Sequence, residues 1–136
     1  MALVTLAPAQ EKQERMRDRL SPEQRAELRT KRMALTLDLN ENQQRDLLKL
    51  NGELGKQRQE KFEKYRAMRE KGQKLSAEER FAHMNALLDE QLAVQKQMKK
   101  ILNEDQYLQW RKMRVAGAKK RRDFVKRRMR MHRQKR

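Results

Sequence analysis

The sequence contains no cysteine, and its 136 residues include only two prolines, four glycines, one tryptophan, two tyrosines and three phenylalanines. The lack of cysteine excludes disulfide bonds, thiolate zinc sites and cysteine nucleophiles. Few turn-forming and aromatic residues make a β-domain a poor interpretation, because strands and their turns are rich in them. No apolar run approaches the roughly 18 residues of a membrane-spanning helix. These absences leave a helical chain as the main expectation.

Charged residues are what the chain has in abundance. They make up 40% of it, against about 25% in an average domain, while the apolar share of 36% is below the usual range of about 45–50%. The formal charge of +17 implies attraction to anionic partners, which include nucleic acid, lipid headgroups and acidic polypeptide. The composition predicts one small all-α protein of long, exposed helices with little core of its own.

A short pattern, Leu-Asn-Glu-x-Gln, occurs twice, with the residues Leu39, Asn40 and Gln43 in one copy and Leu102, Asn103 and Gln106 in the other. An Asn at the N-cap of a helix can accept a hydrogen bond from the third helical residue, and a Gln there can bond back to the backbone of the cap. Two looser copies of this capping box begin with Ser21 and Ser76. The repeat is therefore interpreted as architectural, because it marks four helix starts.

Four helices are expected from these signals, joined by short connections. They run from about Pro22 to Leu37, from Glu41 to about Gly72, from Ala77 to about Ile101, and from Glu104 into the basic C-terminal segment. Short connections favour antiparallel neighbours. The second helix would be about 45–50 Å long at about 1.5 Å per residue. The expected fold is an elongated four-helix protomer built on a long antiparallel helical hairpin.

Apolar residues at three- and four-residue steps mark one face on each helix of this hairpin. They are Leu47, Leu50, Leu54, Phe62, Tyr65 and Met68 on the second helix, and Phe81, Met84, Leu88, Met98 and Leu102 on the third, widened by Leu87, Leu92, Val94 and Ile101. The two faces are expected to pack against each other. Because one hairpin has too few apolar residues to bury both faces, the sequence also predicts a homodimer, with an interface drawn from Leu108, Trp110, Met113 and Val115.

The N-terminal stretch MALVTLAPAQ is uncharged, and Ala7-Pro8-Ala9 before Gln10 resembles the small-residue end of a secretory signal. A basic leader is missing, and the apolar part is shorter than the roughly 7–15 residues of a signal core. Residues 1–9 are interpreted as the remnant of a signal that starts upstream, and residues 10–20 as a flexible segment. This interpretation favours a periplasmic location. The alternative is a disordered tail on a cytoplasmic protein.

The two Leu-Asn-Glu-x-Gln copies, in a small, charged, cysteine-free helical chain, resemble the Leu-Thr-x-x-Gln repeats of the Spy/CpxP family of periplasmic proteins. Asn replaces Thr in both copies, and either residue caps a helix. The resemblance covers roughly Glu23 to Arg114. It implies an all-helical protomer, a curved antiparallel homodimer, and ATP-independent chaperone activity on unfolded envelope proteins through a basic, partly apolar face.

The surface for such unfolded clients is expected where basic side chains lie beside pliable apolar ones, because charge captures at long range and methionine adapts to varied shapes. The candidates are Arg25, Arg29, Arg32 and Met33 on the first helix and Arg58, Lys61, Phe62, Tyr65 and Met68 on the second. The alternative is that the charges form a solvated face and the apolar groups belong to the core.

Residues 119–136 stand apart from the chaperone-like domain expected at 21–118. They contain eleven Lys or Arg and one Asp, a net charge of +10, whereas residues 1–118 carry +7. Such a block can bind nucleic-acid phosphates or an anionic membrane, or it can be disordered and solvated. Its apolar residues form no clean stripe, and no known RNA-binding, zinc-finger or basic-zipper pattern is present. The block also supports an alternative function, a cytoplasmic helical protein that binds the phosphate backbone of nucleic acid.

Residues suited to catalysis or metal binding are few. The two histidines, His83 and His132, lie forty-nine positions apart, and the soft pair of Met131 and His132 is weak evidence for a metal site. Most carboxylates alternate with basic residues on helix surfaces, where pairing along the helix explains them. Glycine-rich phosphate loops and nucleophile elbows are absent from the sequence. The sequence therefore predicts no enzyme, with no catalytic residues, metal site, cofactor or small-molecule substrate.

Overall fold

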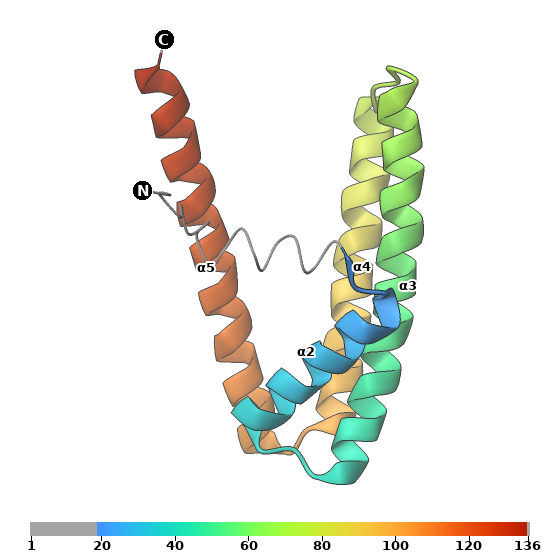
Figure 1. Cartoon of the computed structure of the whole chain (residues 1–136), viewed down its shortest axis with the longest axis vertical. Coiled ribbons are helices and arrows are strands. Elements are labelled where there is room, and N and C mark those ends of the chain that lie inside the picture. The colour runs from blue at the N-terminus through green and yellow to red at the C-terminus, as the bar shows by residue number, and fades with distance from the viewer. Residues whose placement is uncertain (1–18, 136) are drawn as a thin grey trace, which may run out of the picture. The chain divides into compact units, whose positions relative to one another are not determined.

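The structure is a computed structural model that describes residues 19–135. Within that range the chain forms four α-helices and no strand: α2 (Pro22–Leu37), α3 (Glu41–Glu70), α4 (Ala77–Ile101) and α5 (Glu104–Gln134) (Figure 1). The predicted all-α class is confirmed, and so is each predicted helix start. The export remnant expected at 1–9, and all but the last two residues of the flexible segment expected at 10–20, lie outside the described residues.

Each of the four helices begins with the reciprocal pair of hydrogen bonds that the repeat predicts. At the start of α3 the backbone N–H of Gln43 donates to Oδ1 of Asn40 at 2.8 Å, and the N–H of Asn40 donates to Oε1 of Gln43 at 3.0 Å. The same pair of bonds opens the other helices, between Ser21 and Gln24, Ser76 and Glu79, and Asn103 and Gln106. Two of the N–H groups that a helix start leaves unpaired are thereby satisfied each time.

The end of α3 is also determined by contacts between residues close in the sequence. Beyond α3, the N–H of Gly72 donates to the carbonyl of Arg69 and the N–H of Gln73 to that of Met68, both at 3.0 Å, which is the bond pattern of a Schellman motif. Gly72 has a φ of +68°, a conformation that costs other L-residues about 1 kcal/mol or more. The chain therefore reverses direction at Gly72, and the next helix, α4, begins at Ala77.

The chain divides into two compact units, and the division falls within α4, between Ala86 and Leu87. In the first unit α3 turns back along α2, which lies beside the N-terminal half of α3 (Figure 1). A Cβ at Gly55 would lie 3.9 Å from the carbonyl oxygen of Pro22, so the start of α2 is in van der Waals contact with the middle of α3. The core here contains Ala26, Thr30, Leu37, Leu39, Leu47, Asn51 and Leu54.

The apolar faces predicted on the second and third helices are only partly buried. Leu47 is 1% exposed, whereas Phe62 is 62% and Phe81 73% exposed, so the prediction that both faces pack along their length is wrong. The reason is the rotation of α4 about its own axis. Its side toward α3 in the first unit carries His83, which contacts Tyr65, and a residue two positions earlier lies about 200° around the helix. Phe81 therefore points to solvent.

The same rotation continues along α4. The more buried positions of the helix recur at three- and four-residue steps, at His83, Glu90, Val94, Met98 and Ile101. Phe81, Met84, Leu88 and Leu92 lie on the opposite side and are exposed. The sequence pattern therefore identified an apolar stripe on α4 correctly, but the large apolar residues of that stripe lie on the exposed side of the helix.

The second unit contains the rest of α4 and the whole of α5. Met98, Leu102 and Trp110 are buried in it. The assignment of Trp110 to a dimer interface is wrong, because the indole is 6% exposed within the single chain, with the guanidinium of Arg114 over its ring at 5.1 Å. The helix α5 crosses the boundary drawn at 118/119 without a break and ends at Gln134. Among residues 19–135, no helix is long and apolar enough to cross a membrane.

Candidate functional site

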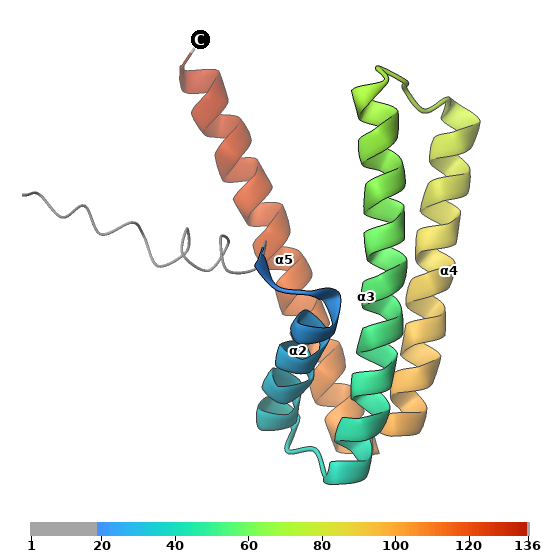
Figure 2. The same cartoon turned by 45° about the vertical axis from the view of Figure 1, so that its right-hand side comes forward.

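A groove of about 360 Å³ lies in the first unit, between the end of α3 and the start of α4. Figure 2 shows these two helix ends side by side, joined by a short connection. Its lining comes from the last turns of α3, from the connection and from the second turn of α4. The lining residues, which define the hairpin groove, are Phe62, Tyr65, Met68, Arg69, Gln73, Leu75 and His83. Most of them are apolar or aromatic.

Three local features of the sequence form this groove: the spacing of residues on α3, the turn at Gly72 and the capping box of α4. Phe62, Tyr65 and Met68 follow one another at three-residue steps on α3 and share one side of the helix. The reversal at Gly72 then brings the chain back, and the capping box at Ser76 fixes where α4 begins. Leu75, directly before that box, lines the groove between the two helices.

The ring of His83 ties the two sides of the groove together. Its Nδ1 is hydrogen-bonded to the hydroxyl of Tyr65, and the two rings meet edge to face with centroids 4.8 Å apart and an angle of 72°. This arrangement is favourable for aromatic rings, since the positive edge of one faces the negative face of the other. The contact fixes how α4 is rotated about its own axis relative to α3. It also gives the Tyr65 hydroxyl a hydrogen-bond partner within the groove.

Basic side chains surround the apolar lining. Between Arg58 and Lys71, α3 and its cap carry six Lys or Arg and three Glu. The Arg66 and Glu70 side chains form an ion pair at 3.2 Å, but both are well exposed, so this pair contributes little to stability. The groove is therefore an apolar strip within a surface of net positive charge.

The residues predicted for client binding fall into two places. Phe62, Tyr65 and Met68 are together in the hairpin groove, and Arg58 and Lys61 precede them on α3. None of the groove's lining residues comes from α2. On that helix the predicted side chains are distributed along one flank, with Arg25, Arg29 and Arg32 exposed and Met33 half-buried.

Four lining residues were not among the predicted ones: Arg69, Gln73, Leu75 and His83. For Leu75 a signal was present, because a leucine before a capping box commonly packs onto the first turns of its helix. His83 gave none, since a lone histidine on a charged helix carries no spacing that points to Tyr65. Only the connection between α3 and α4 determines that pairing.

A second groove, of about 340 Å³, lies between α2 and the start of α3. It is lined by Glu27, Thr30, Lys31, Glu41, Gln44, Arg45 and Leu48. Charges of both signs border it, and Lys31 is already paired with Glu27 at 2.9 Å. It contains none of the predicted residues, and Leu48 is the one large apolar side chain in its lining, so we take the hairpin groove as the candidate site.

In the second unit, the surroundings of Tyr107 lower the pKa of its phenol. Desolvation raises the pKa of its phenol, but hydrogen bonds with Arg111 and Gln95 and the positive charges of Lys99 and Arg111 outweigh it, so the pKa lies below its ordinary value of 10.0. The ammonium of Lys99 lies 5.6 Å from the centre of the Tyr107 ring. This cluster is a cationic environment around one phenol.

Possible metal ligands are dispersed. Within residues 19–135, no group of three or more His, Asp or Glu side chains is placed to hold a metal ion. The two histidines lie in different units, His83 in the hairpin groove and His132 on α5.

One comparison with known proteins gave a match. The family described as Domain of unknown function (DUF4890) matches residues 9–110, which are 102 of the chain's 136 residues. The matched range contains α2, α3, α4, the hairpin groove and the first turns of α5, and it ends before the basic block. No curated protein and no solved structure matched the chain.

Proposed function

Since the chain belongs to the DUF4890 family, a family defined without a function, its role has to come from its own residues, and we propose that it is an ATP-independent chaperone. It binds apolar and acidic segments of unfolded proteins at the hairpin groove and keeps them from aggregating. The observation that carries this proposal is that Phe62, a large apolar side chain that lines the groove, is 62% exposed on a helical hairpin of net positive charge.

Exposed aromatic rings are unfavourable in water, at roughly 25 cal/mol for each Å² of apolar surface. A chain with so few apolar residues leaves Phe62, Phe81 and Met84 exposed in its first unit, close to the hairpin turn. Apolar surface of this kind, bordered by charge, is typical of interaction sites. It favours the binding of other apolar chains over a role in the protein's own core.

The shape and chemistry of the groove suit clients without a fixed structure. Met68 is flexible and polarisable, so it adapts to different side chains, and the apolar strip is too small to bind any one client irreversibly. The net positive charge around the groove, with six Lys or Arg against three Glu between Arg58 and Lys71, attracts acidic segments to this surface. Weak apolar contacts with electrostatic capture allow release without nucleotide hydrolysis.

The capping boxes add a further argument. Their likeness to the Leu-Thr-x-x-Gln repeats of the Spy/CpxP family supports a chaperone, and with it a periplasmic location and a homodimer. Of the residues expected at the dimer interface, Leu108, Met113 and Val115 are exposed and available to a second copy. We propose that the second copy of the chain binds at these three residues of α5, and that Trp110 is not part of the interface.

An aggregation assay tests the proposal. A denatured client is diluted at near-physiological salt, and its light scattering is followed with and without the full-length protein. We expect the wild-type chain to slow aggregation at a few-fold molar excess, and the variant Phe62→Asn to lose most of this effect. The matched control is Leu35→Asn, because Leu35 is 86% exposed and lies on α2, away from the groove. If the wild-type chain leaves aggregation unchanged, the proposal is wrong.

A further inference from the structure

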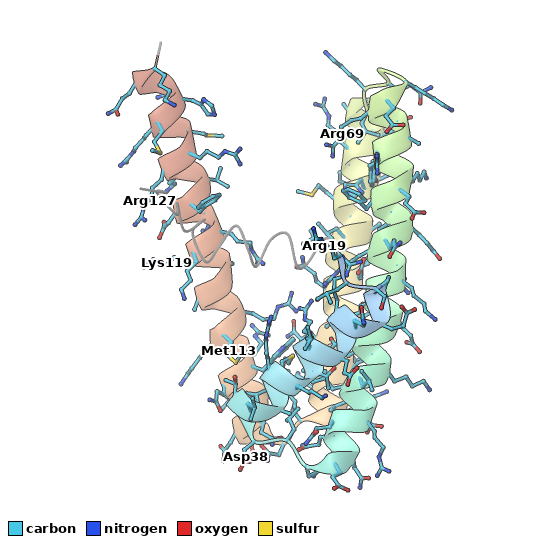
Figure 3. All side chains as sticks on the ribbon, in the orientation of Figure 1. Arg19, Asp38, Arg69, Met113, Lys119 and Arg127 are labelled. Carbon is cyan, nitrogen blue, oxygen red and sulfur yellow. The ribbon has the colours of Figure 1, made fainter. Side chains whose placement is uncertain are left out.

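The C-terminal half of α5 carries the densest charge of the molecule. From Lys119 to Lys135 every residue is exposed, and the helix continues to Gln134. Figure 3 shows side chains projecting from either side of this ribbon, with Lys119 and Arg127 labelled. A helix that buries nothing of its own over four turns presents its whole circumference to a partner.

One side of this segment is a continuous basic stripe. Its residues follow one another at steps of three and four, which places them on a single face: Lys119, Arg122, Lys126, Arg130 and Arg133. From first to last they span about 21 Å at about 1.5 Å per residue. The stripe has the charge and the spacing to follow a row of phosphates.

The other sides of the segment are basic as well. Lys120 and Arg127 are seven residues apart and lie about 100° from the stripe, and Arg121 and Arg128 lie nearly opposite to it. Cationic groups therefore surround the helix. A flat partner, such as a membrane surface, would leave half of them unused.

The apolar residues of the segment do not form a membrane-binding face. Phe124 and Met131 lie together on one side, and Val125 and Met129 lie on another. Arg128 and Arg121 come between these two pairs. A helix that lies in a lipid interface needs one continuous apolar face with the charges opposite to it, so a lipid surface is a poor fit.

A groove with phosphates on both walls matches this distribution, and we propose that α5 binds duplex nucleic acid, with residues 119–133 lying in the major groove of DNA. The major groove of B-form DNA is about 12 Å wide and admits one α-helix. Phosphates on its two edges would face opposite sides of the helix, so the stripe and the opposite arginines would both be neutralised. Seven of the eleven basic residues of the block are arginines, whose planar guanidinium groups suit phosphate oxygens.

Contacts with phosphates dominate recognition in this arrangement. The segment has no Asn and only one Gln, Gln134 at its end, so it lacks the side chains that read adenine. Binding to phosphates releases counterions, so the affinity must fall steeply as salt rises. The inference rests on α5 alone and is independent of the proposed chaperone activity. For an exported chain, the partner would be DNA outside the cytoplasm.

The test uses the full-length chain and a labelled duplex of about 20 base pairs, which is two helical turns. Fluorescence anisotropy gives the affinity between about 50 and 200 mM salt. We expect neutralisation of the stripe by Lys119→Gln, Arg122→Gln, Lys126→Gln, Arg130→Gln and Arg133→Gln to weaken binding by about tenfold or more and to reduce the slope of log affinity against log salt by about 4. Glutamine keeps the helix propensity of the segment, and circular dichroism checks that each variant is folded.

Two further variants make the test specific. Neutralising Lys120, Arg121, Arg127 and Arg128 on the other faces must also weaken binding severalfold, because the groove has two walls. Neutralising five exposed lysines of the first unit, Lys49, Lys56, Lys64, Lys71 and Lys74, removes the same charge as the stripe variant and must leave the salt slope nearly unchanged. Equal losses from this control and the stripe variant would overturn the proposal, and so would a loss confined to the stripe.

The same protein is also offered other polyanions. Vesicles that contain anionic phospholipid, or polyglutamate, at equal concentration of negative charge must compete at least tenfold less well than unlabelled duplex. Equal competition by either would show that α5 recognises charge without the duplex, and the proposal would be wrong.

Discussion

The side-chain amide of Asn51 donates a hydrogen bond to the hydroxyl of Thr30 at 3.0 Å and joins α3 to α2 inside the first unit. The Thr30 hydroxyl in turn donates to the carbonyl of Ala26 at 2.7 Å. Both side chains are buried, so water is not available to replace either partner. This relay fixes how far the two helices are shifted along each other, which the surrounding alanine and leucine contacts alone would specify less strictly.

The first prediction concerns this pair. Thr30→Val leaves the amide of Asn51 buried without its acceptor, so we expect the free energy of unfolding to fall by about 1–3 kcal/mol. Urea denaturation followed by circular dichroism measures it. The double variant Thr30→Val, Asn51→Leu removes both polar groups and should lose less than the sum of the two single variants. Simple additivity of the two changes would contradict the coupling.

The capping boxes make a second prediction. Asn40→Ala and Asn103→Ala each remove an N-cap acceptor, and each should lower the free energy of unfolding by about 1 kcal/mol, within a range of about 0.5–2. Asn40→Ser and Asn103→Ser keep an acceptor at the same place and should stay close to the wild type. An equal loss from the serine and alanine variants would mean that the side-chain bonds of Asn40 and Asn103 contribute nothing to stability.

Tyr107 supplies a prediction on pH. Because the pKa of its phenol is below 10.0 in the folded chain, the unfolded chain binds more protons between the two pKa values, and this group's contribution to stability rises with pH in that window. The contribution is lost as the pH falls through the folded pKa. Phenolate absorbance of the wild type, corrected with Tyr107→Phe, should therefore show a midpoint below 10.0. Arg111→Gln should raise that midpoint, and a midpoint unmoved by the substitution would exclude Arg111 as the cause.

The proposed homodimer is tested by mass. Sedimentation at micromolar concentration should give twice the chain mass of 16.5 kDa for the wild type. Leu108→Glu together with Val115→Glu puts charge on exposed positions of α5 and should shift the protein to the monomer without loss of helicity. A fully helical wild-type monomer at these concentrations would exclude the dimer.

The helix starts could be predicted to the residue because their cause is local. Each capping box joins two residues only three positions apart, so the chain does not need its tertiary contacts to specify it. The side of α4 that faces inward could not be predicted in the same way. It depends on how the connection after Gly72 rotates the helix, and Phe81 was the stronger apolar signal although His83 makes the contact.

The candidate site was predictable on α3 and less so around it. Phe62, Tyr65 and Met68 are apolar or aromatic residues on one side of a single helix, which a sequence pattern can show. Their partners Leu75 and His83 lie across a chain reversal, and a pattern along one helix carries no information about them. The state of the basic block was also open, because charge repulsion favours disorder whereas Lys, Arg and Met favour helix. The structure continues α5 through it.

The most direct test of the central claim, that unfolded proteins bind at the hairpin groove, is site-specific photo-crosslinking. A photoreactive phenylalanine analogue at position 62 is compared with the same analogue at position 35, which lies on α2 and is more accessible, at 86% exposed against 62%. With a denatured client present, we predict crosslinks from position 62 that disappear when the client is folded, and few from position 35. Equal crosslinking from both positions, or none from position 62, would contradict the account.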